Sequence, residues 1–75
     1  MDKKKVAGRL LRLRGTRSQE EVAAALGIRQ STLAMYERGA RMPRDEIKLA
    51  IARYYGCSVG DLFFGENDTI RVDMR

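Results

Sequence analysis

The 75 residues carry a net charge of +5 and are 44% hydrophobic, which suffices for one small domain with a modest core. With no histidine and a single cysteine, Cys57, the chain lacks the residues of a usual zinc site and a partner for an internal disulfide, which suits a reducing cytoplasm. It also lacks an apolar run of about 18 residues and the apolar segment of a signal peptide, so we expect neither a membrane span nor secretion.

Charge is distributed unevenly along the chain. Residues 1–44 hold 11 Lys and Arg against 4 Asp and Glu, a net of +7, whereas residues 45–75 hold 4 against 6, a net of −2. Such an asymmetry predicts that the first part contacts an anionic partner such as nucleic acid. The plainer alternative is a basic surface that only keeps the protein soluble.

The first predicted helix spans residues 4–14, because Val6, Leu10 and Leu13 recur at the spacing of one helical face. Gly15 ends it. The lysines at residues 3–5 form a basic arm, which is either a solvated terminus or a contact to a nucleic-acid backbone.

A second and a third helix are predicted on either side of Gly27. Ser18 suits the N-cap of a helix that begins at Gln19, and Glu21 completes a capping box with it. The third helix spans residues 30–38, and Gly27 can adopt the left-handed conformation of the turn between the two. Two helices joined by a short glycine-containing turn are typical of the helix-turn-helix, whose second helix enters the DNA major groove.

Two more helices follow. Residues 44–55 are predicted to form the fourth, with Pro43 at or before its first turn and Gly56 just past its end. Ser58 suits the N-cap of a last short helix. The side chains of this helix expected to pack inward are Val59, Leu62 and Phe63.

The residues after this domain, which we place at 1–65, change character. In the tail, residues 66–75, Ile70, Val72 and Met74 alternate with polar residues, which is the period of a β-strand. A lone strand on a helical domain has no partner in its own chain, so the tail is either disordered or pairs with a second copy. We therefore expect a homodimer formed by the last helix and the tail. The predicted dimerisation residues are Leu62, Phe63, Phe64, Ile70, Val72 and Met74.

The region around the third helix also carries a long pattern at fixed offsets. Its residues are Ser18, Gln19, Glu20, Val22, Ala23, Leu26, Gly27, Ile28, Ser31, Thr32, Leu33, Tyr36, Glu37, Gly39, Arg41 and Pro43. This pattern resembles that of the lambda-repressor/Cro-like helix-turn-helix family, also called the XRE family, and the resemblance covers residues 6–64. It implies an all-α, compact five-helix bundle, to which the strand-like tail is added.

The outward face of the third helix is predicted to read base edges. The candidate base contacts are Gln30, Ser31, Ala34 and Met35. A glutamine amide can pair with adenine N6 and N7, a serine hydroxyl can donate or accept, and apolar side chains can meet thymine methyls. The resemblance implies base contacts at Gln30, Ser31 and Met35, although an exposed methionine can also be an isolated apolar surface residue.

Phosphate contacts are predicted around the same helix. Gln19 begins the second helix, where free backbone N–H groups and the helix dipole favour an anion, and the resemblance implies a phosphate contact there. The alternative for Gln19 is a solvated side chain. The arginines predicted to contact phosphates at the two ends of the third helix and in the following loop are Arg29, Arg38, Arg41 and Arg44.

Glu37 falls on the inward edge of the third helix, beside Tyr36, where a half-buried carboxylate needs a partner. The resemblance implies an arginine at the end of the first helix. Arg14, which is in phase with Leu10, is the first candidate, and Arg12 is the second. We expect this ion pair to fix the third helix relative to the first.

The residues of the third helix favour a DNA-binding function over a protein-interaction function. Residues 29–36 contain no Asp or Glu, as a DNA-reading face requires. We therefore expect a sequence-specific transcription regulator, a small dimeric repressor that binds an inverted repeat in double-stranded DNA in a bacterial or prophage setting. The alternative is a protein-interaction module, such as an antitoxin-like partner. We expect no catalysis, metal, cofactor or small-molecule effector domain.

Overall fold

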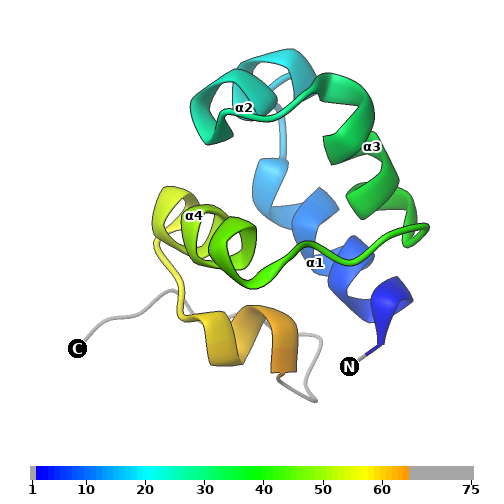
Figure 1. Ribbon diagram of the computed structural model, residues 1–75, viewed down its shortest axis with the longest axis vertical. Helices are drawn as coiled ribbons and strands as arrows, with labels where there is room; N and C mark the ends of the chain where they lie inside the picture. The colour runs from blue at the N-terminus through cyan, green and yellow to red at the C-terminus, as the bar shows by residue number, and fades with distance from the viewer. Residues whose placement is uncertain (1, 65–75) are drawn as a thin grey trace.

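The computed structural model describes residues 2–64, and within that range it contains helices and no strand (Figure 1). The elements in chain order are α1 (Lys3–Arg14), α2 (Gln19–Leu26), α3 (Gln30–Arg38), α4 (Asp45–Tyr55) and the short π-helix η1 (Gly60–Phe64). The predicted all-α bundle of five helices is confirmed. The predicted boundary at residue 65 and the strand containing Ile70, Val72 and Met74 lie outside the described residues.

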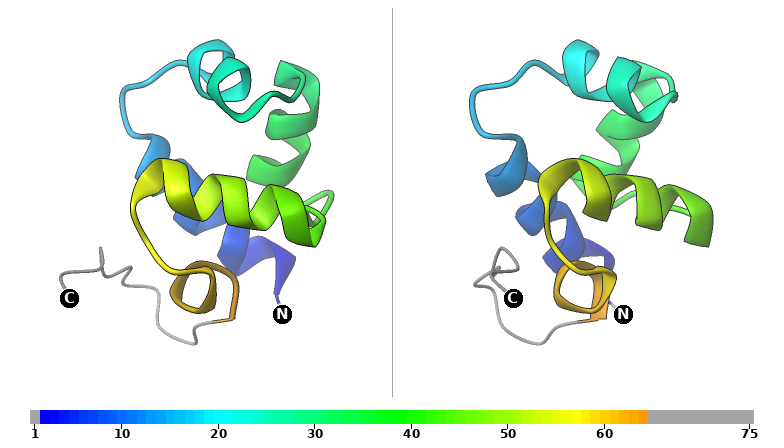
Figure 2. Two further views of the ribbon diagram at one scale, coloured as in Figure 1. Left: turned by 60° about the vertical axis from the view of Figure 1, so that its left-hand side comes forward. Right: turned by 90° about the vertical axis from the view of Figure 1, so that its left-hand side faces the viewer.

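The helices enclose one core. α1 contacts both α3 and η1, whereas α2 packs on α3 and α4. α2 lies at one end of the molecule and η1 lies at the other, as Figures 1 and 2 show. Every element contributes a side chain that is almost fully buried: Val6, Leu10, Val22, Leu33, Ile51, Leu62 and Phe63. Burying these apolar side chains together is what holds five short helices in place, because helices of this length are only marginally stable alone.

α1 begins one residue earlier than predicted. The Asp2 carboxylate caps it by accepting hydrogen bonds from the backbone N–H groups of Lys4 at 2.9 Å and Lys5 at 3.4 Å. These two hydrogen bonds also lower the pKa of Asp2. The three lysines at residues 3–5 are thus part of the first turn of α1 and not an unstructured arm, and they are exposed. Their contact to a nucleic-acid backbone stays a prediction.

α1 is also joined to η1 by a residue that the sequence pattern did not single out. Arg9 lies beside the apolar stripe of α1 and is only 1% exposed. Its Nη1 donates a hydrogen bond to the carbonyl oxygen of Leu62 at 3.0 Å. This bond gives a buried carbonyl group of η1 a hydrogen-bond donor, which a backbone carbonyl in a protein core requires.

The start of α1 lies directly against the end of α3. Gly39 follows α3 with φ +75°, a left-handed conformation that side chains disfavour. A Cβ atom at this position would lie 3.3 Å from the carbonyl oxygen of Lys3 and 3.4 Å from Cα of Lys4. The glycine thus allows a close backbone approach, which places the lysines of α1 beside the end of α3.

α4 begins at Asp45, one residue later than predicted, and Arg44 is its N-cap. The last helix starts as predicted from Ser58, whose Oγ accepts a hydrogen bond from the backbone N–H of Asp61 at 3.0 Å. Its wider π-helical turn was not predicted. Leu62 and Phe63 are buried in the core, so their inward packing is confirmed.

Candidate nucleic-acid interface

The turn between α2 and α3 consists of residues 27–29. Gly27 has the left-handed conformation, with φ 72° and ψ 29°, and the backbone N–H of Ile28 donates to the carbonyl oxygen of Ala23 at 3.0 Å. This closes the end of α2 in a Schellman-type cap. Ala23 is almost fully buried, and its small side chain lets α2 and α3 cross closely. The pair therefore has the local structure expected of a helix-turn-helix.

α3 has a buried face and an accessible face. Leu33, Tyr36 and Glu37 are buried, which fixes the orientation of the helix in the fold. Gln30 and Ser31 are exposed at its start on the accessible face. The two apolar candidates on that face, Ala34 and Met35, are half-buried. All four predicted base-contact residues thus retain surface that a partner could touch.

Four exposed arginines lie at the two ends of α3 and in the segment that leads to α4. Arg29 is the N-cap of α3 and makes no side-chain capping hydrogen bond, and Arg38 is the last residue of the helix. Arg41 lies in the loop that follows, and Arg44 precedes α4. In residues 2–64 none of these four arginines forms a salt bridge. Their guanidinium groups are thus available for an anionic partner.

A network of side-chain hydrogen bonds connects the interior of the fold to the accessible start of α3. Arg14 Nε donates to Glu37 Oε2 at 2.8 Å, so Arg14 and not Arg12 is the partner of Glu37. Gln19 Nε2 donates to the other carboxylate oxygen, Oε1, at 2.9 Å. Gln30 Nε2 donates to Gln19 Oε1 at 3.4 Å.

The position of Glu37 explains why both of its oxygens are bonded. Glu37 is only 4% exposed, and a buried carboxylate without partners is costly. The link from Gln19 to Glu37 was not predicted, since the sequence indicated only a phosphate contact or a solvated side chain for Gln19. Gln19 is half-buried, and its amide nitrogen has a second hydrogen for another acceptor.

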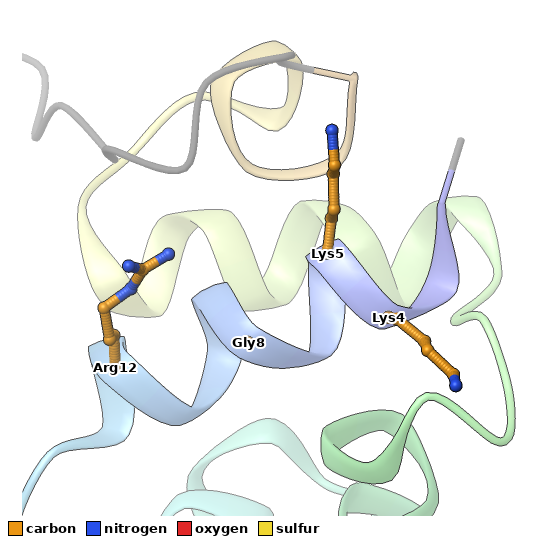
Figure 3. Close-up of a pocket in the computed structure, with 4 residues that line it drawn as sticks. All are labelled: Lys4, Lys5, Gly8 and Arg12. Atoms are coloured by element: carbon orange, nitrogen blue, oxygen red, sulfur yellow. The ribbon is translucent and has the colours of Figure 1, made fainter.

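A hollow of about 390 Å³ on α1 is also cationic, since it is lined by Lys4, Lys5, Gly8 and Arg12 (Figure 3). The three charged side chains do not converge. Lys4 extends to the opposite side of α1 from Lys5 and Arg12. This arrangement does not form a single anion site, although Lys4 lies beside Gly39 at the end of α3.

The predicted dimerisation residues of the last helix lie in different environments. Leu62 and Phe63 are 0% and 1% exposed within the chain, so contact with a second copy would require them to leave the core. Phe64 is 58% exposed. The Nζ atom of Lys48, a largely buried lysine of α4, lies 5.7 Å from the ring centroid of Phe63 and 5.4 Å from that of Phe64. Ile70, Val72 and Met74 are outside the described residues.

Membrane-spanning helices and metal sites are both absent from the described residues. No helix among them is both long enough and apolar enough to cross a membrane. Residues 2–64 also contain no group of three or more His, Cys, Asp or Glu side chains arranged to hold a metal ion.

Comparison with known proteins agrees with this geometry. A family model described as helix-turn-helix matches residues 9–62, which include all of α2, α3 and α4. The chain belongs to this family. The family is one of transcription regulators and not of enzymes, and it is the lambda-repressor-like type predicted from the sequence.

Two curated proteins are similar to this chain. The cryptic phage CTXphi transcriptional repressor RstR of Vibrio cholerae is 35% identical over 65 residues, covering 87% of this chain and 59% of the repressor. An uncharacterized HTH-type transcriptional regulator of Methanocaldococcus jannaschii is 31% identical over 51 residues, covering 68% of this chain and 77% of that protein. The chain thus spans about three-fifths of the phage repressor. No solved structure matches it significantly. The family match and these two similarities together relate the chain to helix-turn-helix proteins that regulate transcription.

Proposed function

We propose that this protein binds a specific sequence in double-stranded DNA as a homodimer and represses transcription. The observation that carries the proposal is the accessible face of α3, where Gln30 and Ser31 are exposed. Exposed arginines occur at both ends of this helix and in the segment after it, and they form no salt bridge within residues 2–64. Donors and acceptors on such a face can read base edges in the major groove, while the arginines hold phosphates on both sides.

The proposed mechanism divides the work between two sets of residues. Gln30, Ser31, Ala34 and Met35 meet the bases, and Gln19, Arg29, Arg38, Arg41 and Arg44 meet the phosphates. A twofold dimer presents two copies of α3 to successive major grooves on one side of the duplex. The proposed operator is therefore an inverted repeat whose half-sites are about one helical turn, roughly 34 Å, apart.

The similarity to a phage repressor supports repression, and it suggests a bacterial or prophage setting in the cytoplasm. The chain covers 59% of that repressor, so family membership alone does not establish how this chain dimerises or which DNA it binds. We propose both.

The test begins with selection of bound duplexes from a random pool, which gives the preferred operator. Gln30→Ala should then weaken binding to the operator by about 1–3 kcal/mol, leave binding to random DNA nearly unchanged and relax the preference at one base pair. Arg41→Ala is the matched control, because a phosphate contact contributes equally to all sequences. If selection recovers no preferred sequence, or if Gln30→Ala weakens binding to operator and random DNA alike, base reading by α3 is wrong.

A further inference from the structure

The Glu37 carboxylate determines which way the Gln19 amide points. Both oxygens of an ionised carboxylate, such as one that forms an ion pair with arginine, accept hydrogen bonds and cannot donate them. Oε2 accepts from Arg14 Nε at 2.8 Å, which leaves Oε1 to accept from Gln19 Nε2 at 2.9 Å. The Gln19 amide therefore turns its nitrogen toward Glu37 and its oxygen away.

The Gln19 amide in turn determines the direction of the Gln30 amide. Gln19 Oε1 is an acceptor only, and Gln30 Nε2 donates to it at 3.4 Å. One Nε2 hydrogen and the oxygen of Gln30 remain for a partner outside the fold. Adenine requires this combination, since its N7 accepts a hydrogen bond and its N6 amino group donates one.

We infer that Glu37 is a positioning residue for base recognition, which acts through Gln19 to orient the Gln30 amide for adenine. Glu37 is 4% exposed and so acts without touching DNA, while Gln30 is exposed at the start of α3. The inference rests on the proposed function, because Gln30 must meet a base. Glu37 would then have two roles. Its ion pair with Arg14 fixes α3 relative to α1, and its carboxylate, which can only accept hydrogen bonds, determines through Gln19 which atoms of the Gln30 amide face the DNA.

Glu37→Gln tests this with little change in volume. Arg14 can donate only to the oxygen of the new amide, so the nitrogen of that amide faces Gln19. Gln19 then presents its oxygen inward and its nitrogen outward. Gln30 reverses with it and directs its amide nitrogen, with two donors, toward the groove. Two donors match guanine, which presents the acceptors O6 and N7.

The measurement compares duplexes that differ only at the base pair read by Gln30, identified as the pair at which Gln30→Ala relaxes the selected operator. The unmodified protein should prefer adenine there. Glu37→Gln should reduce the ratio of adenine to guanine affinity about tenfold or more, because a bidentate contact is exchanged for a mismatched one. Affinity for random DNA should change much less than this ratio.

Two controls separate positioning from loss of stability. Ile51→Val shortens a core side chain of α4 and destabilises the fold without touching the network, so it should keep the adenine preference at a temperature where the protein is folded. Gln19→Ala removes the middle of the network. It should weaken the adenine preference without creating one for guanine, and in its background Glu37→Gln should no longer change the ratio.

The inference is overturned if Glu37→Gln keeps the adenine preference that Gln30→Ala loses, or if its effect is undiminished in the Gln19→Ala background. Should Glu37→Gln fail to fold, an unchanged adenine preference in Gln19→Ala alone would overturn it. Failure of the proposed function would be recognised separately. In that case Gln30→Ala would relax no base pair of the selected operator, and Gln30 would have no base for Glu37 to orient it toward.

Discussion

At the scale of single residues, Tyr55 links stability to pH. Its side chain is buried at the end of α4, and its hydroxyl group forms no hydrogen bond with any other described residue. Burial, with a smaller contribution from the charge of Glu37, raises the pKa of Tyr55 from 10.0 to about 12. The folded protein therefore holds this proton more tightly than the unfolded chain does. Its contribution to stability is complete below pH 10 and is lost as the pH rises from 10 to about 12.

Tyr55→Phe should remove this dependence. At pH 11 the unmodified protein should have lost on the order of 1 kcal/mol of unfolding free energy that the variant retains. At pH 7 the variant should be as stable as the unmodified protein or slightly more so, because it no longer buries a hydroxyl group that has no partner. Urea unfolding of both proteins at pH 7 and pH 11 measures this, and the ionisation of lysines cancels in the comparison. Parallel losses of stability in the two proteins would contradict the assignment.

At the scale of elements, the junction between α1 and α3 depends on Gly39. Gly39→Ala should destabilise the fold by about 1 kcal/mol or more, because alanine disfavours a positive φ and its Cβ would crowd the first turn of α1. The matched control is Gly8→Ala, because Gly8 lies inside α1 and a Cβ there meets no atom within 4 Å among those compared. Gly8→Ala should stabilise α1 by roughly 0.5–1 kcal/mol. Thermal unfolding of the two variants distinguishes them, and shifts of the same sign would rule out this explanation.

The start of α3 has no side-chain cap. Arg29 occupies the N-cap without a capping hydrogen bond, where serine would accept one from the backbone. Arg29→Ser should therefore raise the unfolding free energy by about 1 kcal/mol and weaken binding to every duplex by removing a phosphate contact. Thermal unfolding and DNA titration of the same preparation test both effects. A variant that is more stable and binds DNA equally well would remove Arg29 from the interface.

The elements also differ in how far the sequence determines them. α2 and α3 have the predicted bounds, because Ser18, Gly27 and Gly39 are end signals that act within one turn. α1 starts one residue earlier than its apolar spacing predicts, because the spacing carries no information about the cap that Asp2 provides. The π-helical turn of η1 has no local signal that we could identify. It occurs where Leu62 and Phe63 enter the core and where Arg9 contacts a carbonyl 53 residues away.

In the candidate site, too, some features follow from the local sequence and others depend on how the helices pack. The accessible face of α3 follows from its periodicity, and the resemblance supplied Arg14 as a candidate partner for Glu37. The hydrogen bond from Gln19 to Glu37 depends on how closely the start of α2 approaches the end of α3, a distance that neither helix determines alone. The burial of Lys48 against the rings of Phe63 and Phe64 likewise depends on the packing of α4 and η1.

At the scale of the whole molecule, dimerisation remains a prediction. Phe64 is the exposed member of the predicted set within the described residues, and Leu49 on α4 is another large exposed apolar side chain. Removing residues 66–75 should weaken self-association and leave the helices folded, because the buried core of the described residues, 2–64, is built from side chains of the helices themselves. Sedimentation and circular dichroism of the truncated and full chains test this. If both sediment as the same dimer at equal concentration, the tail is not the dimerisation element.

The proposed mode of binding is that arginines around α3 hold the phosphates of duplex DNA while α3 reads its bases. Its most direct test is the dependence of duplex affinity on salt concentration. Arg29, Arg38, Arg41 and Arg44 give about eight phosphate contacts in a dimer, and at roughly −0.9 for each, the slope of log K against log salt should be about −7. Arg41→Ala should flatten the slope by about one for each subunit. A slope shallower than about −2 for the unmodified protein would contradict the claim.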